Sequence, residues 1–296
     1  MPAFDVVGVG ENSVDVICRV PAAVAPNIKI PIVGRRVMLG GQVATTLATC
    51  ASLGLRVAYV GAFGDDPAGS TLREALELRG VDTSHCVVRD VRSRNAVILV
   101  NDINGDRTVL WERDPQLDLR GDEIPAAAIT SARVLHVDDV DRAATLSAAA
   151  IAHAAGIPVT SDFDQITEHT VDLLSAVSVP ILAEPMPAAL TGVAEPERAL
   201  RTLRRSHQDM LCVTLGTRGA MMLAGDRSYT APAFNVTVVD TTGAGDVFRG
   251  AFIVAMLRGD RPDQILRFAN AAAAIACTRE GALDSVPTLD EVHALM

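Results

Sequence analysis

The residues with the clearest chemical potential stand together at 238–250, where the sequence reads Val-Val-Asp-Thr-Thr-Gly-Ala-Gly-Asp-Val-Phe-Arg-Gly. Gly243 and Gly245 allow a sharp backbone turn and leave N–H groups uncovered at the start of a predicted helix. Free N–H donors and the helix dipole together form a binding site for an anion. Asp246 follows in the first helical turn, where the same dipole favours a carboxylate.

An anion site beside a carboxylate is the arrangement that phosphoryl transfer requires. The glycine turn would neutralise a transferring phosphoryl group, and Asp246 would accept the proton of the attacking hydroxyl group. The alternative interpretation is a plain turn followed by a helix cap. Asp240-Thr241-Thr242 before the turn and the apolar helix after it favour phosphoryl transfer over that alternative.

The bulk composition limits the class of protein. Of 296 residues, 49% are hydrophobic and 21% are charged, which is typical of a globular chain that can bury a full core. A net charge of −10 and an aromatic content of 3% make a nucleic-acid binder a poor candidate. A small anionic ligand is still compatible with this charge, because it needs only a local pocket.

The cysteines, the histidines and the N-terminus indicate where the protein works. The five cysteines and six histidines are scattered without metal-ligand spacing, so we expect reduced thiols. Residues 1–10 lack the pattern of a signal peptide, and the longest nearly apolar run, 270–277, is too short to span a bilayer. We therefore expect a soluble, cytoplasmic protein that binds neither membrane nor nucleic acid.

Apolar runs alternate with helical patterns along most of the chain, which predicts an α/β fold. Strands are predicted at 4–10, 56–64, 132–139, 157–164, 179–185 and 209–216. Helices are predicted at 43–54, 65–80, 243–259 and 262–281. Such an order indicates three layers, with a mostly parallel central sheet between two layers of helices. In these sheets ligands bind beyond the carboxyl ends of the strands, so acids and glycines there are candidate site residues.

Two segments do not fit this alternation. Residues 14–39 are rich in proline and β-branched residues, and residues 94–114 contain two strand patterns around the turn Asn104-Gly105. We expect both segments to pair into a small β-sheet that projects as a lid over the strand ends. No linker divides the chain, so residues 1–296 are expected to form a single domain.

The segment 240–252 resembles the C-terminal signature of the ribokinase-like, or PfkB, family of carbohydrate kinases. Segments 38–54, 60–83, 213–220 and 270–288 are also similar to parts of that family, so the resemblance covers nearly the whole chain. It implies a ribokinase-like fold and transfer of the γ-phosphoryl group of ATP to a hydroxyl group of a small sugar. It also implies Mg²⁺ and allows a monovalent cation such as K⁺ near the anion-hole loop.

The resemblance assigns roles to individual residues. Asp246 matches the catalytic base, and the anion hole is the backbone of Gly243, Ala244 and Gly245. Sugar binding is implied for Asp15, for Gly40 and Gly41 with Gln42 directly after them, and for Asp138 at a strand end. Nucleotide binding is implied for Thr214, Gly216, Gly219 and Asn270. Trp111 either stacks on a sugar face from the lid or packs within the lid interface.

Two departures from the family pattern bear on the substrate and the metal. Gln42 stands where ribokinases carry a lysine, and Thr45 stands where they carry an asparagine, which argues against ribose. The family's Asn-x-x-Glu motif is missing at 183–186, where Glu184 is the only acid and the candidate Mg²⁺ ligand. Glu184-Pro185 and the lid hairpin resemble ketohexokinase-type and sulfofructose kinase-type members more than ribokinase, which favours a ketose or a related sugar.

Further charged residues have two interpretations each. Asp139 and Asp141 are expected to cap the helix that follows them. Asp162 faces the phosphates or Mg²⁺, while Asp164 is an equal candidate for a helix cap. Arg249 either reaches an anionic group of the substrate or is a solvated helix residue.

The sequence is also compatible with two other functions, and it predicts one assembly. A nucleoside kinase would share the fold and the signature, and a catalytically weak sugar-sensing protein would explain the missing Asn-x-x-Glu motif. The scarcity of aromatic residues argues against the first, and the intact Gly-Ala-Gly-Asp sequence argues against the second. Apolar residues on the predicted lid, namely Ile28, Ile30, Ile32 and Val97, predict a homodimer formed through the lid.

Overall fold

A parallel sheet forms the centre of the fold in the computed structural model, which describes residues 2–103, 107–163 and 165–296. The strand order is β11-β10-β1-β4-β6, and every neighbouring pair is parallel. These strands are β1 (Phe4–Val9), β4 (Val57–Val60), β6 (Val81–Asp82), β10 (Ala132–Asp138) and β11 (Val159–Asp162). Because their carboxyl ends share one edge, the acids that follow them are brought together.

A second group of strands, in the order β12-β13-β14-β15, continues this sheet. The bridges Thr160–Val179 and Phe163–Leu182 hold its first strand beside β11. The strands are β12 (Ile181–Ala183), β13 (Met210–Thr214), β14 (Ala220–Ala224) and β15 (Arg227–Ala231). The last two are antiparallel additions that the sequence analysis did not identify. The predicted mostly parallel sheet is confirmed.

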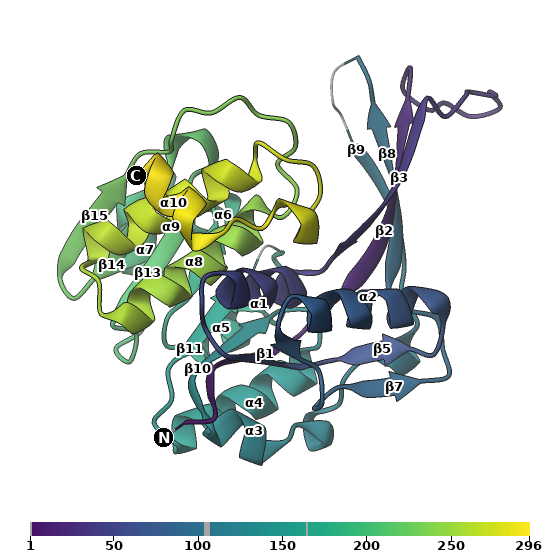
Figure 1. Cartoon of the computed structure of the whole chain (residues 1–296). Helices are drawn as coiled ribbons and strands as arrows, with labels where there is room; N and C mark the ends of the chain where they lie inside the picture. The colour runs from purple at the N-terminus through teal and green to yellow at the C-terminus, as the bar shows by residue number, and fades with distance from the viewer. Residues whose placement is uncertain (1, 104–106, 164) are drawn as a thin grey trace.

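Helices cover both faces of the sheet, as Figure 1 shows. Val6 and Val134 face one hydrophobic core and their neighbours Val7 and Leu135 face another, so the sheet is buried on both sides. The first core includes side chains from α1 (Gln42–Ser52), α2 (Pro67–Leu78), α8 (Ala244–Arg258), α9 (Pro262–Ala276) and α10 (Leu289–Leu295). The second includes side chains from α3 (Ala126–Thr130), α4 (Arg142–Ala154), α5 (Thr170–Ser175), α6 (Pro185–Thr191) and α7 (Pro196–Leu203). The three-layer prediction is therefore confirmed.

Short 3₁₀ helices complete the connections. They are η1 (Pro115–Leu117), η2 (Gly121–Glu123), η3 (Gly216–Arg218) and η4 (Leu283–Ser285). Within the described part of the chain, no helix combines the length and the apolar character that crossing a bilayer requires.

A separate small sheet projects from the layered body (Figure 1). Its order is β3-β2-β8-β9, with β2 and β8 parallel and the outer pairs antiparallel. Its strands are β2 (Ser13–Val20), β3 (Gly34–Gly40), β8 (Asn95–Asn101) and β9 (Arg107–Glu112). The segments 14–39 and 94–114, which do not fit the alternation of strands and helices, thus pair in this sheet. The predicted turn at Asn104-Gly105 lies outside the described residues, as does Asp164.

One predicted strand is divided in two. The segment 56–64 forms β4 and then β5 (Ala62–Gly64), which leaves the central sheet and pairs with β7 (Val87–Arg89). Gly61 lies at the break, where a Cβ atom would come within 2.2 Å of the Tyr59 hydroxyl oxygen. That hydroxyl group donates a hydrogen bond to the Gly10 carbonyl oxygen at 2.7 Å. The chain therefore bends around a buried tyrosine that also fixes the end of β1.

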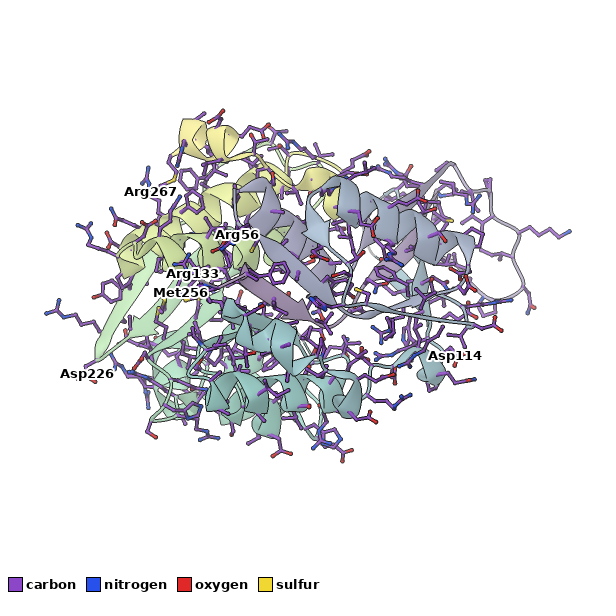
Figure 2. All side chains as sticks on the ribbon, turned by 60° about the horizontal axis from the view of Figure 1, so that its bottom comes forward. Arg56, Asp114, Arg133, Asp226, Met256 and Arg267 are labelled. Atoms are coloured by element: carbon purple, nitrogen blue, oxygen red, sulfur yellow. The ribbon has the colours of Figure 1, made fainter. Side chains whose placement is uncertain are left out.

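Charged side chains cluster at the opposite, amino-terminal edge of the strands. Arg56 and Arg133, labelled in Figure 2, both contact the Asp5 carboxylate at 3.3 Å. Partial burial works to raise the pKa of Asp5, but the hydrogen bonds from these arginines outweigh it and hold the pKa below its ordinary value. This cluster tightens the edge of the sheet that faces away from the ligand-binding end.

A comparison of Gly41 with Gly54 separates the cost of backbone strain from the cost of a steric clash. Both have positive φ, at 100° and 96°, but a Cβ on Gly41 would lie 2.4 Å from Asn12 Cα, whereas a Cβ on Gly54 meets nothing within 4 Å. We predict that Gly54→Ala costs about 1–2 kcal/mol of folding free energy through strain alone. Gly41→Ala should cost about 1–3 kcal/mol more, because the backbone must also shift. Urea unfolding of the two variants measures this difference, and equal losses would contradict the contact.

Candidate active site

The carboxyl ends of the central strands carry acids on neighbouring strands. Asp138 ends β10 and lies opposite Asp162, which ends β11, in the parallel register. Glu11 follows the end of β1, the strand on the other side of β10. The ligand-binding edge expected of a parallel sheet is thus lined with carboxylates.

A cavity of about 430 Å³ opens beside the first turn of α8. Gly243, the N-cap residue, adopts the left-handed conformation with φ of 76°. The predicted residues that line this cavity are Thr214, Gly216, Gly219, Asn270, Ala244 and Gly245. The structure therefore brings the predicted nucleotide residues together with the predicted anion-hole turn. Its other lining residues are mostly apolar and include Phe234, Val236 and Phe248, which suits a flat ring system.

Asn270 and Gly219 shape the wall of this cavity. Asn270 is buried, and its side-chain N–H₂ group donates hydrogen bonds to the carbonyl oxygens of Ala231 at 2.9 Å and Pro232 at 3.1 Å. Gly219 has φ of 93°, and a Cβ there would come within 2.1 Å of the Ala231 carbonyl oxygen. Both residues thus hold the segment after β15 against the core and shape the wall of the cavity.

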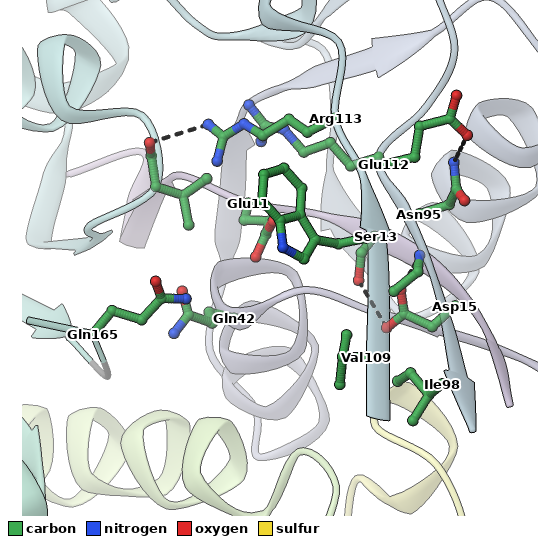
Figure 3. A pocket seen from close by; sticks show the side chains of 14 residues that line it. Glu11, Ser13, Asp15, Gln42, Asn95, Ile98, Val109, Glu112, Arg113 and Gln165 are labelled. Carbon is green, nitrogen blue, oxygen red and sulfur yellow. Dashed lines mark hydrogen bonds between the residues drawn. The ribbon is translucent and has the colours of Figure 1, made fainter. Parts of the chain in front are cut away.

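A second cavity, also of about 430 Å³, lies between the small sheet and the ends of the central strands (Figure 3). The predicted sugar-binding residues Asp15, Gln42 and Trp111 line it. Asp15 accepts hydrogen bonds from the Ser13 hydroxyl group at 3.3 Å and from the Ala96 N–H group at 3.1 Å. Burial raises the pKa of Asp15 above its ordinary value. The Trp111 side chain is 74% exposed, so its ring is accessible to a ligand.

Three other predicted sugar-binding residues lie outside the lining of this cavity. Gly40 and Gly41 connect the small sheet to Gln42 at the start of α1. Asp138 is fully buried and accepts hydrogen bonds from the N–H groups of Glu11 at 2.6 Å and Val140 at 3.0 Å. The pKa of Asp138 is raised well above its ordinary value, mainly by burial and to a smaller extent by the nearby charge of Glu11. This position does not support direct sugar contact by Asp138 and indicates that it holds the backbone beneath the cavity.

Helices α1 and α8 bring the two cavities side by side. The Thr46 hydroxyl group on α1 donates a hydrogen bond to the Asp246 carbonyl oxygen at 3.1 Å. The helices approach closely because Gly250 has no side chain: a Cβ there would lie 2.6 Å from Thr49 Cβ. Gln42 begins α1 and lines one cavity, while Ala244 and Gly245 begin α8 and line the other. Asp246 follows directly after Gly245 in the first turn of α8 and belongs to the lining of neither cavity.

A buried ion pair supports this turn. Arg249 and Asp162 are 4% and 1% exposed, and their closest nitrogen and oxygen atoms are 2.8 Å apart. The Gln42 amide N–H₂ group reaches the same Asp162 oxygen at 3.4 Å. A Cβ on Gly245 would lie 2.8 Å from Arg249 Nη1, so the guanidinium group packs directly against the glycine turn. The solvated alternative for Arg249 is wrong, because its guanidinium group is buried beneath the turn and paired with Asp162.

A second buried network lies under the small sheet. Asp141 occupies the N-cap position of α4, but its side chain makes no capping hydrogen bond. Its carboxylate instead accepts hydrogen bonds from Arg94 at 2.6 and 2.8 Å and from Arg113 at 2.8 Å. The predicted side-chain cap is therefore wrong for Asp141, because two cations compete for a carboxylate that is fully buried.

Glu184 lines neither of these two cavities. It pairs with Arg218 and lines a separate depression beside α6. In the ranges that the structure describes, no group of three acidic, histidine or cysteine side chains is placed to hold a metal ion. The predicted role of Glu184 as a Mg²⁺ ligand gains no support from this position, and no step below depends on it.

Among the charged residues that line the second cavity, the sequence analysis missed Glu11, Arg94, Glu112 and Arg113. Glu11 could have been identified, because it follows Gly10 directly after the first strand, where acids were candidates. No motif marks Arg94 or Arg113. Their positions depend on how the small sheet packs against the start of α4.

Known proteins resemble this chain over nearly its whole length. The model of the pfkB family of carbohydrate kinases matches residues 3–289. The ribokinase of Haemophilus influenzae is 27% identical over 299 aligned residues, covering 95% of each chain. Probable fructokinase-4 of Arabidopsis thaliana is 31% identical over 285 residues, covering 87% of each chain. A solved ribokinase of Cryptococcus neoformans in complex with ADP is 25% identical, with a TM-score of 0.81 and coverage of 99% of this chain and 100% of that one.

The Arg249–Asp162 pair gives a prediction about stability. Arg249→Met should cost about 3–5 kcal/mol, because it leaves the Asp162 carboxylate buried without its cation. The double variant Arg249→Met/Asp162→Leu should be more stable than that single variant, since it removes the uncompensated charge. Free energies of unfolding from urea titration test this. A double variant whose loss is the sum of the two single losses would contradict a direct coupling.

Proposed function

The chain belongs to the pfkB family of carbohydrate kinases and is a phosphotransferase with an alcohol group as acceptor, and on this premise we propose the following mechanism. It transfers the γ-phosphoryl group of ATP to a hydroxyl group of a small sugar. Asp246 is the general base, and the backbone of Gly243, Ala244 and Gly245 is the anion hole. The observation that carries the proposal is that Ala244 and Gly245, directly before Asp246, line the cavity beside α8. This helix packs against α1, whose first residue Gln42 lines the other cavity.

The cavity beside α8 is the proposed ATP site. Its apolar walls suit an adenine ring, and its inner end is the N-terminus of a long helix, where phosphate oxygens are stabilised. The relative crystallised with ADP supports a nucleotide in this fold. Arg249 packs against Gly245 and, through its pair with Asp162, would hold the backbone of the anion hole in position. Mg²⁺ bound to the ATP phosphates would offset further negative charge.

The cavity under the small sheet is the proposed sugar site. Asp15 and Gln42 offer hydrogen-bond partners for sugar hydroxyl groups, and the accessible Trp111 ring offers an apolar face. Relatives named as ribokinase and as fructokinase support a pentose or hexose of this size. We propose that the small sheet acts as a lid whose closure excludes water, which would otherwise compete with the sugar as phosphoryl acceptor.

Removing the base should separate catalysis from binding. Asp246→Asn keeps the size of the side chain but cannot accept a proton, so kcat for sugar phosphorylation should fall by at least about a hundredfold. Sugar binding, measured by calorimetry, should change little. Asp263→Asn is a matched control, because Asp263 is also an acid in the first turn of a helix, and it pairs only with exposed Arg261.

The assay is ADP release with ATP and Mg²⁺ over a panel of ketohexoses, pentoses, deoxygluconates, sugar phosphates and nucleosides. Asp246→Asn serves as the blank. A response to adenosine but to no sugar would favour a nucleoside kinase. Near-normal turnover in Asp246→Asn would contradict the proposed base, and sugar binding without any ADP release would favour a sensing protein.

We also propose a homodimer formed through the small sheet. Ile28, Ile32, Val37, Val109 and Leu110 are apolar and exposed on this sheet or on the loop joining β2 to β3. Such a cluster is typical of a protein interface. Size-exclusion chromatography with light scattering should give about twice the mass of one chain, and Val37→Asp should shift it towards the monomer. A clean monomer for the unmodified protein at micromolar concentration would rule this assembly out.

A further inference from the structure

The charged residues that line the sugar cavity differ in whether they have partners of opposite charge. Its two basic residues already have acidic partners: Arg94 pairs with Asp141 at 2.6 Å, and Arg113 pairs with Asp141 at 2.8 Å and with Asp118 at 2.9 Å. Their positive charge is therefore largely neutralised before a ligand arrives. A sugar that carried a negative charge would find no free cation among these residues.

Three acids line the cavity: Glu112 pairs with Arg92 at 3.2 Å, whereas Glu11 and Asp15 form no ion pair within the described residues. Asp15 receives hydrogen bonds only from neutral donors, the Ser13 hydroxyl group and the Ala96 N–H group. The Glu11 carboxyl group takes part in none of the hydrogen bonds or ion pairs found there, and it faces the same space as Ser13 and Asp15 (Figure 3). These two carboxyl groups therefore determine the local charge.

The backbone of Glu11 is fixed on both sides. Its N–H group donates to the buried Asp138 carboxylate at 2.6 Å, and its carbonyl oxygen accepts from the Ala44 N–H group at 3.2 Å. Gly10 makes the first contact possible, because a Cβ there would lie 2.3 Å from an Asp138 oxygen. A carboxyl group held in this way is presented to a ligand at a defined place, which is what a specificity residue requires.

We propose that Glu11 is a specificity-determining residue that hydrogen-bonds a hydroxyl group of an uncharged sugar and excludes sugars bearing a carboxylate, phosphate or sulfonate group. This inference rests on the proposed sugar site and adds a substrate class to it. It favours neutral pentoses, hexoses and their alcohols, and it argues against the sulfonated sugars of the sulfofructose kinase-type members.

The ionisation of Glu11 supports the exclusion and gives it a pH dependence. Burial raises the pKa of Glu11 to about 7; Arg94 and Arg113 oppose this shift, and Asp15 and Asp141 add to it. The buried Asp138 also interacts with Glu11, and Glu112 lines the same cavity. Because the pKa is raised, Glu11 is mostly neutral at pH 6 and mostly ionised at pH 8. Repulsion of an anionic sugar should therefore grow between these two values.

The test compares matched sugars that differ in charge, namely D-fructose with D-fructose 6-phosphate and D-glucitol with D-gluconate. Dissociation constants are measured by calorimetry at pH 6 and pH 8 in the Asp246→Asn background, with and without Glu11→Gln. We expect the preference for the uncharged sugar to be about tenfold larger at pH 8 than at pH 6, and Glu11→Gln to remove this difference. Glu74→Gln removes an exposed acid from α2, outside the cavity lining, and should leave the preference unchanged.

Several outcomes would overturn the proposal. Charged and uncharged sugars could bind equally well at pH 8, or Glu11→Gln could leave the preference for the uncharged sugar unchanged. Glu74→Gln could also reduce that preference as much as Glu11→Gln does. Because binding is measured without turnover, the test is independent of the proposed chemistry. An unmodified protein that shows the predicted preference but phosphorylates no sugar would contradict the phosphoryl transfer and still support the role of Glu11.

Discussion

The close contact between α1 and α8 is the constraint on which the rest of the site depends. Gly250 lets the two helices approach until Thr49 lies against its backbone, and Thr46 bonds to the carbonyl oxygen of Asp246. The N-termini of both helices consequently lie beside the same edge of the sheet. One helix begins at the proposed sugar cavity and the other at the proposed phosphate site, and the proposed base lies in the first turn of the second helix.

Buried ion pairs keep the walls of both cavities in place. Asp162 with Arg249 supports the glycine turn, and Asp141 with Arg94 and Arg113 supports the base of the small sheet. Such pairs add little net stability, because desolvation offsets most of their attraction. Their geometric demands are strict, however, and each pair links elements that are distant in sequence. The protein thus uses charge to position its site.

The two cavities have opposite electrostatic character. Beside α8, the N-terminal end of the helix and its dipole create a region that attracts phosphate oxygens. Under the small sheet, Glu11 and Asp15 create a region that repels anions and accepts hydrogen bonds from hydroxyl groups. This separation would direct the nucleotide to one side of Asp246 and an uncharged sugar to the other.

The local pattern of the sequence determined the layered α/β fold, the four main predicted helices and the Gly-Ala-Gly-Asp turn, because periodicity and glycine placement act over short distances. The family resemblance and the glycine turn together named Thr214, Gly216, Gly219, Ala244, Gly245 and Asn270, which line the nucleotide cavity although their segments are tens of residues apart. Only the tertiary structure decided that Asp141 pairs with Arg94 and not with its own helix, that Asp138 is buried, and that Arg249 is paired. Those outcomes depend on contacts between residues tens of positions apart, whose burial and competing partners no local pattern encodes.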